Sequence, residues 1–89
     1  MGSSVRSRHR RTLEKLFRRP PPSDVAWRDV VALIVAIGGE VRSGTGSVRA
    51  VSLRGRDLVV REPHPSSELP KGMVVRLCRF LTELGEEPR

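Results

Sequence analysis

His64, which stands between prolines at positions 63 and 65, is the side chain of this sequence best suited to proton transfer. Imidazole titrates near neutral pH, so it can accept or release a proton under cellular conditions. Arg61 precedes it and Lys71 follows it, and cations beside a proton-transfer group are typical of sites that act on anions. We interpret His64 as a candidate general acid or base. A structural turn histidine is the alternative.

Cationic side chains that can hold phosphate are concentrated in the middle of the chain. Positions 42 to 61 contain a single acid, Asp57, among the arginines Arg42, Arg49, Arg54, Arg56 and Arg61. The planar guanidinium fork contacts two phosphate oxygens at once, which favours phosphate over diffuse attraction. These residues form the best candidate nucleic-acid face. For some of them the alternative is an ordinary solvated position that discourages edge-to-edge aggregation.

The stretch of residues 43–47 is built of small residues, among them Gly46 and Ser47. Such a turn lets backbone amides approach a phosphate closely, although an ordinary turn between strands is the alternative. Aromatic residues are not interleaved with the arginines. Recognition of RNA by its backbone and shape is therefore favoured over stacking of single-stranded bases.

No set of His, Cys or carboxylate residues has the spacing of a metal site or of acyl-transfer chemistry. Catalysis, if present, is then expected to need no metal and no cofactor. RNA can be cut in this way, because a base can deprotonate its 2′-hydroxyl for attack on the adjacent phosphorus while cations neutralise the developing charge.

The 89 residues suffice for one hydrophobic core. Residues 1–19 carry a net charge of +6, out of +7 for the whole chain. We expect residues 1–9 to form a basic flexible arm and residues 10–89 to form the single domain.

The strong positive charge predicts a polyanionic partner. The lone Cys78 and the absence of a signal sequence or an apolar run of about 20 residues favour the cytoplasm and argue against a membrane role.

Periodicity predicts six elements. Helical spacing indicates a short helix over residues 12–17, a second over 24–37 capped by Ser23 or Asp24, and a last one over 70–84. Period-two patterns indicate strands over 40–43, 48–53 and 57–62.

Short connections between the three strands favour an antiparallel meander with a tight turn at residues 54–57. The side chains expected to face the core are Val51, Leu53, Leu58 and Val60. The fold class is therefore α+β, with the last two helices on one face of a three-stranded antiparallel sheet and the opposite face free.

Several motifs together resemble the HicA toxins. These are the segment 27–30 (WRDV), the helix end 37–41 (IGGEV), the turn 44–47 (GTGS) and above all 63–72 (PHPSSELPKG). The similarity covers about residues 13–85. It implies a double-stranded-RNA-binding-like fold, cleavage of mRNA without a metal, and neutralisation by a HicB-type antitoxin.

One position departs from the family pattern. In the better-known members a histidine taken to be catalytic directly follows the Gly-Ser turn, whereas this chain has Val48. We therefore expect His64 to transfer the proton, with RNA held by Gly46, Ser47, Arg49, Arg54, Arg56, Arg61 and Lys71. Two alternatives are a noncatalytic RNA-binding module of the same fold, and a subunit whose basic face is bound chiefly by an acidic antitoxin.

Overall fold

The computed structural model describes residues 7–63 and 68–88. Three helices and three strands follow one another in the order ααβββα. They are α1 (Ser7–Phe17), α2 (Trp27–Ala36), β1 (Glu40–Ser43), β2 (Val48–Leu53), β3 (Arg56–Arg61) and α3 (Lys71–Glu83). The predicted order of elements is confirmed, and β1 and β2 have the predicted bounds. β3 begins and ends one residue earlier than expected.

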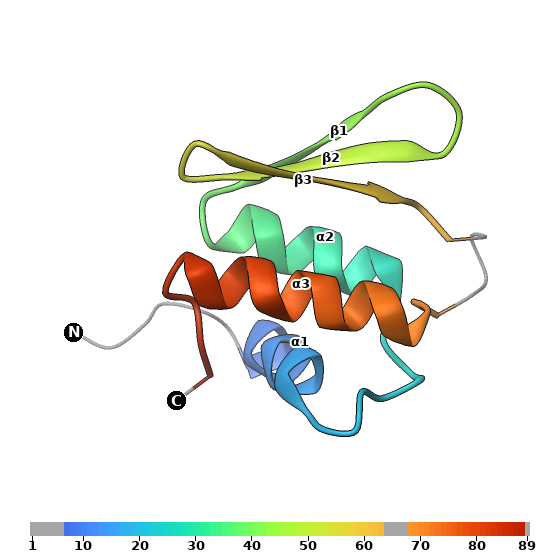
Figure 1. The fold of residues 1–89 in the computed structure, drawn as a ribbon. Coiled ribbons are helices and arrows are strands. Elements are labelled where there is room, and N and C mark those ends of the chain that lie inside the picture. Colours follow the sequence, from blue (N-terminus) through green and yellow to red (C-terminus); the bar gives the residue numbers. More distant parts are fainter. Residues whose placement is uncertain (1–6, 64–67, 89) are drawn as a thin grey trace.

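The elements form three layers, with the sheet on one side, α2 and α3 beneath it, and α1 on the far side of both helices (Figure 1). The middle layer is buried from both sides, which explains why α2 is apolar around most of its surface: Val30, Leu33 and Ile34 are all fully buried. The α+β class is confirmed, as is the packing of the last two helices on one face of the sheet.

The sheet is an antiparallel meander in the order β1-β2-β3. Val51, Leu53 and Val60 are buried against the helices and Leu58 is half-buried, as predicted. The turn between β2 and β3 contains only Arg54 and Gly55, both with positive φ, which is the pattern of a type I′ hairpin turn. Because the turn is this short, Arg56 already pairs with Leu53 in the ladder.

The start of α2 differs from the prediction, because neither Ser23 nor Asp24 caps it. The N-cap is Ala26, which makes no side-chain capping bond. Ala26 instead forms a β-bridge with Glu68, and the Leu69 amide donates to the Val25 carbonyl at 2.8 Å. This pairing holds the chain extended up to Ala26, so the helix starts at Trp27.

The first helix is longer than predicted, since α1 begins at Ser7 rather than at Thr12. Residues 7–9, which we expected in the flexible arm, lie within it, and His9 is only 7% exposed. His9 therefore belongs to the folded region and not to a flexible arm. Leu13 and Leu16 of α1 join the same core as the sheet residues.

Gly39, which joins α2 to β1, has no room for a side chain. A Cβ there would lie 2.5 Å from the Ser52 carbonyl oxygen and 2.8 Å from Cγ2 of Ile34. We expect Gly39→Ala to lower the free energy of unfolding by about 1–3 kcal/mol, because the strand or the helix must shift. Chemical denaturation measures the change.

Gly72→Ala is the matched control for this prediction. Gly72 lies in α3, and a Cβ there would meet nothing within 4 Å, so alanine should be neutral or stabilise the helix by up to about 1 kcal/mol. Equal unfolding midpoints for the two variants would contradict the close approach of β2 to Gly39.

Candidate nucleic-acid interface

The sheet has one face packed on helices and one outer face that no described element covers (Figure 1). Alternation along the strands assigns eight side chains to this outer face. They are Glu40, Arg42, Val48, Ala50, Ser52, Asp57, Val59 and Arg61. The outer face thus holds two of the five arginines of the predicted cluster, and no aromatic residue.

Arg61, Ser47 and the loop between β1 and β2 meet at one end of this face. The Arg61 guanidinium donates to the Ser47 hydroxyl at 3.5 Å. Arg61 is exposed and, among residues 7–63 and 68–88, no carboxylate lies within ion-pair distance of it. Its charge is therefore available to an external anion.

The loop itself is a tight turn, in which the Gly44 amide donates to the Val48 carbonyl at 2.8 Å and the Val48 amide to the Thr45 carbonyl at 3.0 Å. Gly46 has a φ of +59° and every loop residue is exposed. Within the described residues, the amides of Thr45, Gly46 and Ser47 have no hydrogen-bond acceptor. Successive unpaired amides of this kind suit an anion.

Arg49 lies near this loop, but its guanidinium makes its hydrogen bonds within the protein. Its Nε donates to the Glu62 carboxylate at 2.7 Å, and its Nη1 donates to the carbonyls of Gly46 and Val48 at 2.9 and 2.8 Å. Only 22% of its side chain is exposed. Arg49 therefore fixes the shape of the loop instead of offering its charge to a ligand.

Arg54 and Arg56 lie at the opposite end of the sheet, at the β2–β3 turn. Arg54 donates to the Leu84 carbonyl at 3.0 Å and pairs with Glu86, while Arg56 pairs with Glu83 at 3.2 Å. Both arginines therefore tie the turn to the C-terminal end of α3, remote from Arg61 and Ser47.

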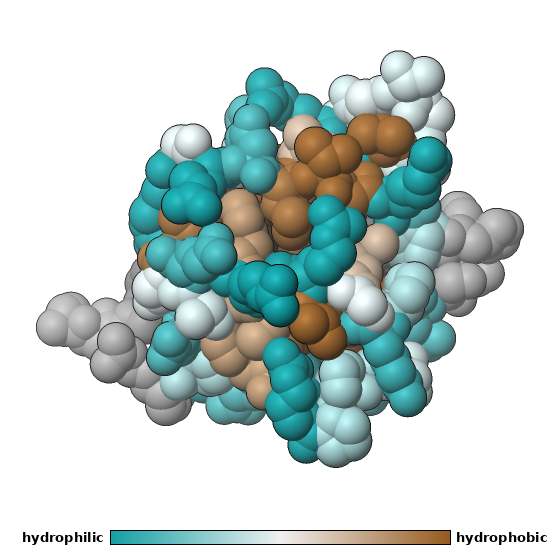
Figure 2. Space-filling model, viewed as in Figure 1, coloured by the Kyte–Doolittle hydropathy of each residue, from teal (hydrophilic) through white to brown (hydrophobic). Residues whose placement is uncertain are grey.

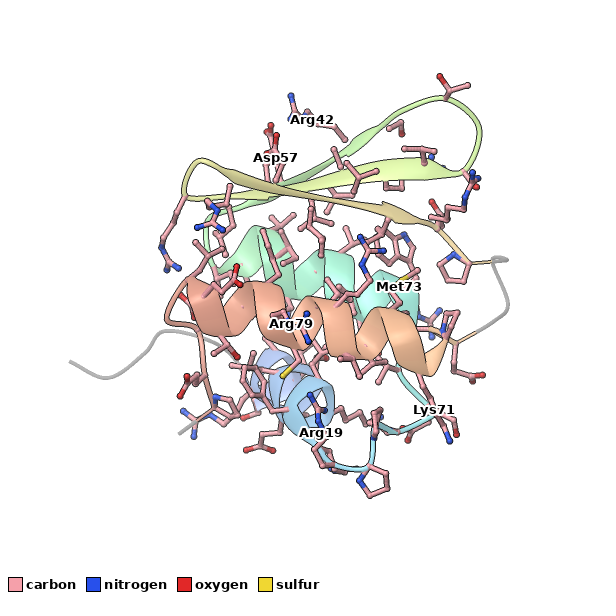
Figure 3. All side chains as sticks on the ribbon, in the orientation of Figure 1. Arg19, Arg42, Asp57, Lys71, Met73 and Arg79 are labelled. Carbon is pink, nitrogen blue, oxygen red and sulfur yellow. The ribbon has the colours of Figure 1, made fainter. Side chains whose placement is uncertain are left out.

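Arg42 is the other arginine of the outer face, and Figure 3 shows it beside Asp57 on the side away from the helices. It bonds the Ser52 hydroxyl at 3.1 Å and lies 3.5 and 3.9 Å from the carboxylates of Glu40 and Asp57. The structure thus does not gather the five arginines on one face. Four of them have a carboxylate within ion-pair distance, and Arg61 has none among the described residues.

The two remaining candidate residues are Lys71 and His64. Lys71 is its first residue and is exposed at the end of the helix, below the level of the sheet (Figure 3). His64 lies outside the described residues. In the sequence it follows Arg61 by three positions.

The family model of the HicA toxin of bacterial toxin–antitoxin systems matches residues 27–85. The chain belongs to the HicA toxin family. Comparisons with curated proteins and with solved structures gave no match. The matched range runs from α2 to α3, so α1 precedes the part of the chain that the family model covers.

Membership of the HicA family confirms the resemblance drawn from the motifs, and the α+β arrangement agrees with the double-stranded-RNA-binding-like fold it implied. A toxin of such a system has an antitoxin as its partner. None of the described helices has the length and apolar character needed to cross a bilayer.

Val48 occupies the family position at which the catalytic histidine was expected. It is half-buried on the outer face, next to Ser47 and directly opposite Arg61 in the β2–β3 ladder. Val48, the position at which this chain departs from the HicA pattern, thus lies between Ser47 and Arg61 in the candidate interface. Among the described residues, no three His, Cys, Asp or Glu side chains gather as metal ligands would.

Two exposed arginines of α3, Arg76 and Arg79, were not among the predicted site residues of this HicA chain. They line a groove between α3 and β3. Their spacing on the polar side of the last helix was visible in the sequence, but nothing local showed that an edge strand lies beside them.

Proposed function

We propose that this chain is a toxin that binds mRNA and cleaves it as a metal-independent endoribonuclease. The RNA backbone lies across the end of the outer sheet face at Arg61, Ser47 and Gly46, with Lys71 as a further phosphate contact. The observation that carries the proposal is the exposed Arg61 guanidinium beside Ser47, close to a loop with unpaired amides. The guanidinium and the backbone amides can each donate hydrogen bonds to phosphate oxygens.

In this proposal His64 accepts the proton of the 2′-hydroxyl, and the freed oxygen attacks the adjacent phosphorus. The bond from phosphorus to the 5′-oxygen breaks, a 2′,3′-cyclic phosphate forms, and the leaving oxygen takes a proton from an acid. Arg61 stabilises the negative charge that develops on the phosphate oxygens. Arg49 acts indirectly, by holding the loop through its bonds to Gly46 and Val48.

The second candidate function is RNA binding without cleavage. The observation that favours it is Val48, because an aliphatic side chain opposite Arg61 cannot exchange a proton. Incubation of the purified protein with an mRNA in EDTA distinguishes the two. Fragments ending in a cyclic phosphate support the ribonuclease, whereas intact RNA that is retained by the protein supports the binding module.

The partner of this toxin is proposed to be a HicB-type antitoxin, and both proteins are proposed to act in the cytoplasm. Antitoxin binding is expected to stop growth arrest by the toxin. Acidic surfaces on the antitoxin would suit a chain with a net charge of +7.

Arg61→Gln should weaken RNA binding severalfold and reduce the slope of log affinity against log salt concentration by about one, as expected for loss of one phosphate contact. The measurement is RNA binding at several salt concentrations with His64→Ala as the background, in which cleavage is expected to be slow.

Arg10→Gln is the control for this prediction, because it removes the same charge from an exposed position of α1, a helix on the far side of α2 and α3 from the sheet. If the two variants lose affinity equally, the binding is diffuse and the assignment to the Arg61 end of the sheet is wrong.

A further inference from the structure

β3 is an edge strand whose outward backbone groups can be identified from the ladder. The Glu62 amide donates to the Ser47 carbonyl, and the Gly44 amide donates to the Val48 carbonyl. Because backbone groups alternate in direction along an antiparallel strand, those of Asp57, Val59 and Arg61 point away from β2. They form a row of outward N–H and C=O groups that no strand of the described chain pairs with, and such a row is the template for an added strand.

A side chain of α3 occupies the centre of this row. Arg76 donates from Nη2 to the Val59 carbonyl at 2.8 Å. A guanidinium placed there blocks indiscriminate pairing, as charged groups on natural sheet edges do. Because Arg76 is itself exposed, a ligand with a carboxylate for it can draw it away from Val59.

The edge continues into a groove of about 370 Å³ between β3 and α3. Its apolar lining comes from Leu58, Val75 and Phe80. Its polar lining comes from Asp57, from Arg56 with its ion-pair partner Glu83, and from the two α3 arginines Arg76 and Arg79. Neither of these two arginines has a carboxylate within ion-pair distance among the described residues. Figure 3 shows Arg79 extending from the middle of α3.

The outer side of the same edge is apolar at its centre. Val59 is 56% exposed, one of two large hydrophobic side chains so exposed in the described chain. Figure 2 shows apolar surface over the sheet with hydrophilic side chains beside it. A strand that pairs with β3 thus meets valine on its outer side and arginines on its inner side.

A second copy of this chain fits the edge less well than a different protein. In a symmetric pairing about Val59, Asp57 of each copy would lie opposite Arg61 of the other, which is favourable. However, both copies of Arg76 would converge at the symmetry axis, because Arg76 binds the Val59 carbonyl. Like charges brought together there oppose self-association.

We propose that the free edge of β3 binds an extended acidic segment of a partner protein by strand addition, with the carboxylates of that segment on Arg76 and Arg79 and an apolar side chain over Val59. Backbone bonds to Asp57, Val59 and Arg61 supply affinity, and the alternating pockets supply specificity. That this partner is the antitoxin rests on the proposed function. The edge also includes Arg61, so an added strand would cover part of the proposed RNA site.

The test uses a short capped peptide that alternates glutamate with valine, titrated into the full chain while amide NMR shifts and fluorescence anisotropy are recorded. We expect the shifts to centre on Asp57, Val59 and Arg61. Arg79→Glu should weaken peptide binding by about tenfold, because a like charge then faces the carboxylates. Arg10→Glu, the same charge reversal on α1, should change it by less than about twofold.

Two further peptides isolate the binding mode. N-methylation of the valines removes the amides that would pair with β3, and replacement of glutamate by lysine reverses the charge; both peptides should fail to bind. Binding of the N-methylated peptide as tight as that of the parent would overturn strand addition.

Other occupants give different results. A concentration-dependent dimer of the free chain, lost in Val59→Pro, would assign the edge to a second copy and overturn the proposal. A loss of RNA affinity in Arg79→Glu that exceeds the loss in Arg10→Glu would assign the groove to RNA and also overturn it. RNA cleavage is measured separately, so failure of peptide binding leaves the proposed ribonuclease unaffected.

Discussion

His64→Ala should lower the rate of RNA cleavage by about 10²–10⁴-fold, the contribution typical of a positioned general acid or base. His64 follows Arg61 by only three positions in the sequence, so a proton-transfer group there can serve RNA held at Arg61. Cleavage of an mRNA in EDTA by the purified proteins measures the effect. Expression of the variant in cells should correspondingly fail to arrest growth.

RNA affinity is the control for this substitution, because loss of a proton-transfer group should leave phosphate binding nearly intact. A variant that binds RNA normally but does not cut it supports the role of His64. Cleavage at the wild-type rate would show that another group transfers the proton. Absence of cleavage by the wild-type chain would favour the noncatalytic module that Val48 suggests.

Leu16→Ala should lower the free energy of unfolding by about 2–5 kcal/mol, because Leu16 is fully buried and the truncation leaves a cavity. The residue belongs to α1, which precedes the range that the family model matches. A loss of this size would show that α1 is an integral part of the core rather than an appended arm. Chemical or thermal denaturation followed by circular dichroism measures it.

Val35→Ala is the control, because Val35 is 58% exposed on α2 and its truncation should change stability by less than about 0.5 kcal/mol. If Leu16→Ala unfolds at the same denaturant concentration as Val35→Ala, α1 does not pack on α2 and α3 in solution.

The two proposed ligands, RNA and an acidic strand, would both bind at β3. The exposed charge of Arg61 lies on the outer face beside the Gly-Ser loop, whereas Arg76 and Arg79 lie on the helix side of the same strand. RNA and an acidic strand would therefore share β3 while contacting different arginines. Substitutions at Arg61 or at Arg79 should therefore weaken the binding of one ligand and leave the affinity for the other nearly unchanged.

Local sequence determined most of the fold. The alternation in residues 48–53 defined both the extent of β2 and its buried side, since one face of the sheet must be apolar to cover the helices. Helical spacing likewise predicted the last helix, whose buried residues include Val74 and Leu77, three positions apart. The pattern also predicted the antiparallel meander, because connections this short leave little other choice.

Other local predictions failed where a distant segment changed the outcome. Pairing of Ala26 with Glu68 overrode the expected helix caps at Ser23 and Asp24. Packing against α2 and α3 stabilised α1 from Ser7 onward, although the polar start of this helix gave little sign of it. Helix ends respond to such contacts because the difference in free energy between alternative caps is only about 1 kcal/mol.

Tertiary structure alone decided which charges are available to a ligand. The sequence between positions 42 and 61 shows five arginines and one acid, but the carboxylates that bind Arg54 and Arg56 come from residues 32 and 27 positions away. Electrostatic attraction depends on distance in space, and a count along the chain omits partners brought in by folding. Hence composition established that this protein is strongly basic, while the packing of α3 against the sheet left Arg61, Arg76 and Arg79 free of acidic partners among the described residues.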